Sequence, residues 1–183
     1  MYNMKIKAVV ASVALLMATT LTTAAMPTAP AKDQDGPDLP SPLCDRLRVG
    51  AGNKLHSQVY ADGVQIYRWD GLSWVFVEPA ATLFANANYD GKVGSHYRGP
   101  TWESSSGSKV VGARLNGCLP DTTAIPWLLL EAVSTGGPGI YSSVTYIQRV
   151  NTKGGLAPAG PGSFIGETVQ IPYTAEYFFY REQ

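Results

Sequence analysis

The sequence predicts an all-β fold, a single-domain antiparallel β-sandwich or partly closed β-barrel of about nine or ten strands. Three observations lead to this prediction. Apolar and polar residues alternate with a period of two along much of the chain after Lys54, as in strands with one buried face. Asp-Gly pairs, which favour tight hairpin turns, recur between the alternating segments. Finally, only 15% of the residues are charged while glycine, proline and tyrosine are abundant, a composition that disfavours helices.

Residues 1–25 are expected to be a cleaved signal peptide. Lys5 and Lys7 give a short positive start, and residues 8–21 form an apolar run that is followed by the small residues 23–25. A membrane-spanning helix needs about 20 consecutive apolar residues, and this run is shorter and rich in threonine. We therefore expect a secreted or periplasmic protein.

Residues 26–43 are rich in proline and are expected to form a flexible tether before a single all-β domain at residues 44–183. The precursor has 14 basic and 14 acidic side chains, so removal of Lys5 and Lys7 leaves a net charge of −2. A nearly neutral surface offers no general attraction to nucleic acid or anionic lipid. We expect no nucleic-acid partner and no stable membrane insertion, and the oligomeric state stays open.

Cys44 and Cys118 are the two cysteines of the chain. In an exported protein the default is one disulfide between them, with two free thiols as the alternative. The bridge would close a loop of about 75 residues, which a chain-entropy model values at roughly 4 kcal/mol. Two cysteines with two scattered histidines do not have the spacing of a zinc site.

In the first half, Asp62-Gly63, Asp70-Gly71 and Asp90-Gly91 are the expected turns. The strands between them are expected at residues 54–60, 64–69, 73–77 and 92–98. Together they predict an antiparallel meander.

In the second half, the apolar run at residues 125–133 fits either a short helix or a strand buried on both faces. Pro126, the shortness of the run and the glycines that follow favour the strand. Gly154 to Gly166 is an expected loop. The remaining strands are expected at residues 109–115, 140–151, and 168–180 with a bend at Pro172.

The best candidate site combines His96, Arg98, Trp102 and Glu103 around a Gly99-Pro100 turn. A binding groove would use Trp102 to stack on a sugar ring and the polar groups to bind its hydroxyls. A catalytic site would pair His96 with Glu103 as general acid and base. In the plainest interpretation Trp102 is a core residue, Glu103 pairs with an arginine, and His96 lies on a solvated edge.

Two further groups have weaker signals. Arg149, Asn151 and Lys153 alternate before a glycine pair and could hold an anion, although such a strand end is more often simply solvated. His56 and His96 would need a third ligand to bind a metal, and nothing in their spacing indicates one, so His56 is expected to be solvated.

Five motifs occur in an order that resembles an exported bacterial and fungal family defined only as a domain of unknown function. The resemblance covers roughly residues 50–180 and supplies no activity, cofactor or catalytic residue. The motifs are Gly63-Val64-Gln65-Ile66-Tyr67, Gly99-Pro100-Thr101-Trp102-Glu103, Ile125-Pro126-Trp127-Leu128-Leu129-Leu130, Gln148-Arg149-Val150-Asn151-Thr152-Lys153-Gly154-Gly155 and Pro172-Tyr173-Thr174-Ala175.

The sequence contains no Gly-x-Ser-x-Gly elbow, P-loop, dinucleotide fingerprint or metalloprotease helix motif. We therefore expect no cofactor and no bound metal. The leading hypothesis is a non-catalytic binding protein for a carbohydrate or a cell-surface polymer, with His96, Arg98, Trp102 and Glu103 as ligand-binding residues. The alternatives are a hydrolase-like enzyme using His96 and Glu103, or a structural envelope protein without a small ligand.

Overall fold

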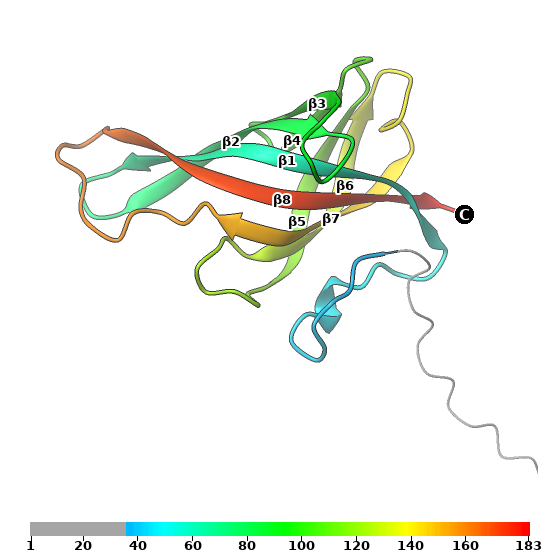
Figure 1. Ribbon diagram of the computed structural model, residues 1–183, viewed down its shortest axis with the longest axis horizontal. Helices are drawn as coiled ribbons and strands as arrows, with labels where there is room; N and C mark the ends of the chain where they lie inside the picture. Colours follow the sequence, from blue (N-terminus) through cyan, green and yellow to red (C-terminus); the bar gives the residue numbers. More distant parts are fainter. Residues whose placement is uncertain (1–35) are drawn as a thin grey trace, which may run out of the picture. The chain divides into compact units, whose positions relative to one another are not determined.

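A computed structural model describes residues 36–183, in which eight antiparallel strands close into a barrel (Figure 1). The strands follow one another around the barrel in sequence order, and the last pairs with the first. The expected signal peptide and the first part of the expected tether lie outside the described residues. The strands are β1 (Asn53–Trp69), β2 (Trp74–Phe84), β3 (Lys92–Tyr97), β4 (Thr101–Ser104), β5 (Lys109–Cys118), β6 (Trp127–Gly136), β7 (Val144–Gly154) and β8 (Thr168–Glu182).

The all-β prediction is confirmed, and of the two architectures considered the chain adopts the barrel. Within residues 36–183 the only helical element is the 3₁₀ turn η1 (Asp45–Leu47). The apolar run at residues 125–133 forms most of β6, as the strand interpretation predicted. Leu129 and Leu130 are buried on opposite faces of this strand, which explains why its sequence does not alternate.

The expected turn at Asp62-Gly63 was wrong, and this is one reason for eight strands rather than nine or ten. Both residues lie inside β1, which is paired with β8 on one edge and β2 on the other. At Gly63 the paired strand β2 lies too close to leave room for a side chain: a Cβ atom there would lie 2.3 Å from the carbonyl oxygen of Ala80. The glycine therefore marks a close approach of two strands, which short-range turn rules do not distinguish from a hairpin. The expected bend at Pro172 likewise does not interrupt β8.

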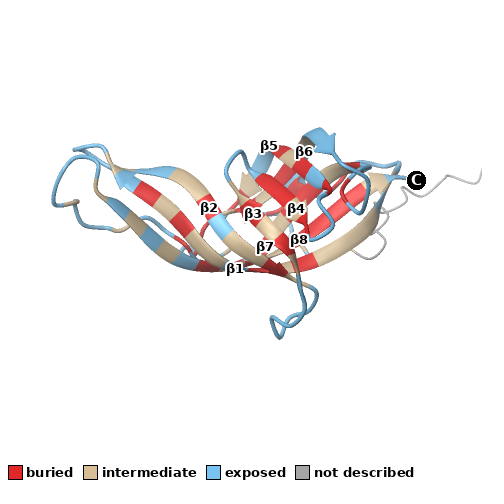
Figure 2. Cartoon of the chain, turned by 90° about the horizontal axis from the view of Figure 1, so that it is seen from above, coloured by how far each residue is buried: buried red, intermediate tan, exposed pale blue. Residues whose placement is uncertain are grey.

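The barrel interior is the larger of two hydrophobic clusters, and it is built mainly from alternate residues of the strands. Along β1 and β2 in Figure 2, buried residues are separated by residues that are intermediate or exposed. This is the period of two expected when one face of each strand lines an interior. The large aromatic side chains of this cluster are Trp102, Tyr141, Tyr173, Tyr177 and Phe179.

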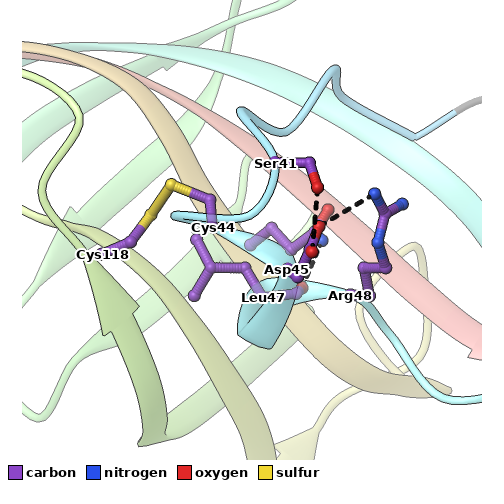
Figure 3. A network of polar contacts seen from close by, with 7 residues as sticks. Ser41, Cys44, Asp45, Leu47, Arg48 and Cys118 are labelled. Atoms are coloured by element: carbon purple, nitrogen blue, oxygen red, sulfur yellow. Dashed lines mark hydrogen bonds and ion pairs between the residues drawn. A yellow bond between two sulfur atoms is a disulfide. The ribbon is translucent and has the colours of Figure 1, made fainter.

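A second cluster lies on the outer face of β5–β8, beneath the N-terminal segment of the described chain. Cys44 and Leu47 are fully buried there, and Cys44 forms a disulfide with Cys118 at the end of β5 (Figure 3). The backbone carbonyl of Leu47 also accepts a 2.7 Å hydrogen bond from the buried side chain of Gln148 on β7. The predicted disulfide is confirmed, and it ties this segment to the barrel wall.

Residues 36–43, the end of the expected tether, are part of this packed segment. Leu39 packs against the outer cluster, and the amide of Cys44 donates to the carbonyl of Pro40 at 2.7 Å. Ser41 donates to the carboxylate of Asp45 at 2.9 Å (Figure 3). Ordered contacts therefore begin before Cys44. In residues 36–183 we find no helix with the length and apolar character to cross a membrane.

Candidate functional site

The β3–β4 hairpin carries the candidate residues and divides them between the two faces of the barrel wall. His96 is paired with Trp102 across the hairpin, and Ser95 is paired with Glu103. Because neighbouring residues of a strand have opposite orientations, His96 and Trp102 face the interior while Glu103 faces outward. The structure thus brings His96 and Trp102 together and does not bring His96 and Glu103 together.

The His96 and Trp102 rings are stacked, with centroids 4.3 Å apart and planes inclined by 13°. Tyr177 of β8 packs edge-on against both rings, at 5.2 Å from each. The Nδ1 atom of His96 lies 2.9 Å from the carbonyl oxygen of Thr101. A carbonyl can only accept, so Nδ1 carries the proton and donates it, which leaves Nε2 as an acceptor in the neutral ring.

His96 is neutral at physiological pH. Its side chain is 3% exposed, and burial is the main reason why its pKa falls from 6.5 to about 3. The hydrogen bond to Thr101 opposes this change, and the positive charge of Arg149 adds to it. A solvated edge position, the plainest interpretation of the sequence, is therefore not what the structure shows for His96. For Trp102 that interpretation is correct, since the indole is 1% exposed.

Glu103 and Arg98 lie on the outside of the barrel in ordinary surface pairs. Glu103 accepts a 2.7 Å hydrogen bond from the Tyr97 hydroxyl and forms a 3.3 Å ion pair with Lys109. The hydrogen bond from Tyr97 is the main reason why the pKa of Glu103 is lowered. Arg98 is largely exposed and forms a 3.2 Å ion pair with Glu78 of β2. A ligand-binding role for these two residues stays a prediction for the outer surface.

A cavity of about 260 Å³ opens between β2, the β3–β4 hairpin, β5 and β6, and reaches the His96–Trp102 stack. Its walls are mostly apolar or aromatic. Gly112 of β5 helps to make room for the indole, because a Cβ atom there would lie 3.1 Å from Cζ3 of Trp102. The lining residues that the argument below uses are Gln65, Phe76, His96, Trp102, Leu128, Arg149 and Tyr177.

Two side chains that line the cavity have buried donors without a hydrogen-bond partner. They are Trp102, through its indole Nε1, and Gln65, through its amide Nε2. The Gln65 side chain interacts with the Tyr173 hydroxyl and opposes the rise of its pKa, but Nε2 makes no hydrogen bond of normal geometry. Leaving such a group unpaired costs about 1–3 kcal/mol, so most buried donors in folded proteins are satisfied. The two unpaired donors and the cavity therefore lie in the same part of the barrel.

Arg149, Asn151 and Lys153, the residues considered as an anion site, do not share one face, because β7 is irregular there. Arg149 lines the cavity, and its Nη2 donates to the carbonyl of Pro126 at 2.8 Å. Asn151 has a positive φ of 51° and donates to Glu176, and Lys153 is exposed. The register of β7 against β8 shifts between Val150 and Lys153, so a simple alternation from Arg149 to Lys153 does not hold.

His56 is of intermediate exposure, and its Nε2 donates to the carbonyl of Ile140 at 2.9 Å in an exposed hydrogen bond. Among residues 36–183, no three histidine, cysteine, aspartate or glutamate side chains are placed to hold a metal ion together.

Sequence reasoning missed Gln65 and Tyr177 as parts of the site. A signal for Gln65 was present: it continues the inward series Val59, Ala61 and Gly63 and precedes Tyr67 on the same face. A polar amide in an otherwise buried apolar series requires a partner. Tyr177 had no such signal, because its contact with the β3–β4 hairpin spans the barrel.

These features define a class of protein: a closed antiparallel β-barrel with a disulfide-tied N-terminal segment and a cavity of ligand size within its wall. The chain belongs to the family described as protein of unknown function (DUF3455), whose family model matches residues 50–181. The expected membership of a domain family of unknown function is thereby confirmed. None of the curated proteins and none of the solved structures matches the chain.

Proposed function

We propose that this chain is an exported, non-catalytic binding protein that holds a small organic molecule in the barrel cavity. The observation that carries the proposal is the coincidence of a preformed cavity with the unpaired buried donors of Gln65 and Trp102. Binding sites for small molecules are typically concave and mostly apolar, with a few placed polar groups that orient the ligand.

The size of the cavity limits the ligand. A cavity of about 150 Å³ is enough to bind benzene, and this one has about 260 Å³. One substituted aromatic ring or one sugar ring is therefore the expected size. If the physiological partner is a carbohydrate or cell-surface polymer, only a terminal or branching unit would enter.

Several features favour binding over catalysis. His96 and Glu103 face opposite sides of the β3–β4 hairpin, so they cannot share a proton across one substrate. With a pKa of about 3, His96 is also a weak base near neutral pH, where an efficient general base has a pKa close to 7. The described residues that line the cavity include no serine, threonine or cysteine nucleophile.

Export is supported by two independent features. Residues 1–25 have the composition of a signal peptide. The Cys44–Cys118 disulfide is of the kind that persists in oxidising compartments and is rare in the cytosol.

The test measures ligand binding to the purified parent chain and to a variant in which a larger side chain fills the cavity. A panel of single-ring probes (glucose, galactose, N-acetylglucosamine, phenol, benzyl alcohol and benzoate) is titrated by calorimetry. Leu128 lines the cavity on β6, so Leu128→Trp should weaken the binding of any positive probe about 10-fold or more. Val133 is 56% exposed on the same strand, and Val133→Trp is the matched control.

The proposal requires at least one probe that binds the parent chain and the Val133→Trp variant alike and binds Leu128→Trp much more weakly. A panel without any binding, or binding that is equal in all three proteins, would contradict a cavity ligand. The first result would favour a structural envelope protein.

A further inference from the structure

Arg149 is a partly buried cation that has no carboxylate partner. It lies on β7 between Leu128 of β6 and Tyr177 of β8, and both neighbours line the cavity. Its Nε and Nη2 atoms share one neutral acceptor, the carbonyl of Pro126, at 3.2 and 2.8 Å, and its side chain also donates to the neutral hydroxyl of Tyr177. The ion pairs among residues 36–183 are Arg48–Asp45, Arg98–Glu78 and Lys109–Glu103.

A guanidinium ion that is partly removed from water and lacks a counterion is costly, so such groups are usually paired. The positive charge of Arg149 acts on tyrosine hydroxyls inside the barrel. Burial raises the pKa of Tyr177 and of Tyr67, and Arg149 opposes the rise at both hydroxyls. This cation is therefore directed at the interior rather than at bulk solvent.

The charged residues that line the cavity add up to an excess of positive charge. Arg149 and Arg114 contribute two positive charges, and Glu78 contributes one negative charge that is already paired with Arg98. His96 contributes none, because it is neutral at physiological pH. Because Arg98 already neutralises Glu78, the excess is two positive charges, and an anionic ligand would reduce it.

The neutral polar groups of the cavity also favour an anionic ligand, because they are hydrogen-bond donors. Trp102 Nε1 and Gln65 Nε2 are both donors, and both are buried without partners. A carboxylate accepts through two oxygens with about four lone-pair sites, and its hydrogen bonds to a guanidinium are stronger than those between neutral groups. A sugar hydroxyl would satisfy single donors but would leave the charge of Arg149 uncompensated.

We propose that the ligand is a small organic acid with an aromatic or aliphatic ring, whose carboxylate is bound by Arg149 and by the donor side of the cavity near Gln65 and Trp102. This inference rests on the proposed function and specifies its ligand. The ring occupies the apolar part of the cavity, where Phe76 and Leu128 provide the contacts. Nε2 of His96 accepts a hydrogen bond from a ring hydroxyl or amine if the acid has one.

The experiment compares acids with their uncharged amides. Benzoate and cinnamate, and benzamide and cinnamamide, are titrated by calorimetry at pH 7 into the parent chain, Arg149→Gln and Arg46→Gln. The expected result is that at least one acid binds the parent chain about 10-fold tighter than its amide. Arg149→Gln should abolish this preference. Arg46→Gln, which removes an exposed cation of η1 that does not line the cavity, should change it less than about twofold.

Each other outcome is decisive. If an amide binds as tightly as its acid, and Leu128→Trp weakens both, the carboxylate inference fails while the proposed function stands. If sugars or alcohols bind and the acids do not, the result is the same. If no probe binds in the cavity, both proposals fail.

Loss of the bond to Pro126 can prevent Arg149→Gln from folding. In that case Arg149→Lys is the second variant, because it keeps the positive charge and loses the planar fork of donors. The acid is then expected to keep its preference over the amide, with affinity about 3- to 10-fold lower. An unchanged affinity in a folded Arg149→Lys variant, together with equal binding of acid and amide, would overturn the inference.

Discussion

The imidazole of His96 lies flat on the indole of Trp102, with ring centroids 4.3 Å apart, although the two residues sit on different strands. The two stacked rings line one side of the cavity, and the stacking helps to shield His96 from solvent. Its second consequence is electrostatic, because a ring held in this position is expensive to protonate. The histidine that looked most reactive in the sequence is therefore a neutral wall residue.

The first prediction concerns pH. The unfolded chain binds a proton on His96 near pH 6.5, whereas the folded chain does so only near pH 3. Between these values the unfolded state binds more protons, so the free energy of unfolding should fall as the pH falls, by about 1.4 kcal/mol per pH unit from this residue. Urea unfolding of the parent chain and of His96→Phe at pH 7 and pH 4.5 measures the difference.

Other groups also titrate in this range, which is why the variant matters. His96→Phe keeps an aromatic ring over Trp102 and removes the titration, so its stability should depend on pH less steeply by that amount. If the two proteins lose stability in parallel below pH 6.5, His96 is not the buried neutral residue that we describe.

The second prediction concerns the close pairing of β1 and β2 at Gly63. A methyl group there would meet Ala80 and Ala81 within 2.6 Å, and backbone atoms cannot move aside cheaply. Gly63→Ala should therefore lower the free energy of unfolding by about 3 kcal/mol. Gly160→Ala is the control, since nothing lies within 4 Å of its Cβ position, and it should change stability by less than about 0.5 kcal/mol. Chemical unfolding monitored by tryptophan fluorescence would show a similar loss in both variants if this close approach of the paired strands were incorrect.

The third prediction concerns the disulfide. Cys44 and Cys118 are 74 residues apart in sequence, so the bridge should stabilise the fold by about 4 kcal/mol through the restricted unfolded chain. The double variant Cys44→Ala/Cys118→Ala should unfold at a correspondingly lower denaturant concentration. Mass spectrometry after alkylation in denaturant should find no modified thiol before reduction and two after it; two modified thiols before reduction would refute the bridge.

The fourth prediction separates the two faces of the β3–β4 hairpin. Glu103 bonds only to Tyr97 and Lys109 on the outside, so Glu103→Gln should leave probe binding in the cavity within about twofold of the parent chain. Trp102→Phe keeps a buried ring and removes the indole donor, so it should weaken binding of an acceptor-bearing probe about 5- to 10-fold. Calorimetric titration with the best probe of the panel gives both values. The reverse order of effects would place the binding site on the outer surface.

Local patterns were enough to predict the strand character of the chain and the pairing of its two cysteines. Alternation fixes which side chains of a strand share a face, and the interpretation of β6 as a strand follows from its length and flanking residues. The boundaries of the strands could not be predicted as well from local patterns. Asp62-Gly63 has the composition of a hairpin turn, and only the close pairing of β2 beside Gly63 shows why the strand continues.

The sequence by itself determined the β-fold and the disulfide partners, and it identified the segment around His96 and Trp102 as the candidate site. These conclusions depend on residue type and short-range spacing. Tertiary structure alone decided that His96 faces Trp102 and Tyr177, that Glu103 faces outward, and that Arg149 and Gln65 join the same cavity. These relationships depend on the register of strands far apart in sequence and on closure of the barrel through β1 and β8. A shift of one residue in that register would exchange the two faces and dismantle the cavity.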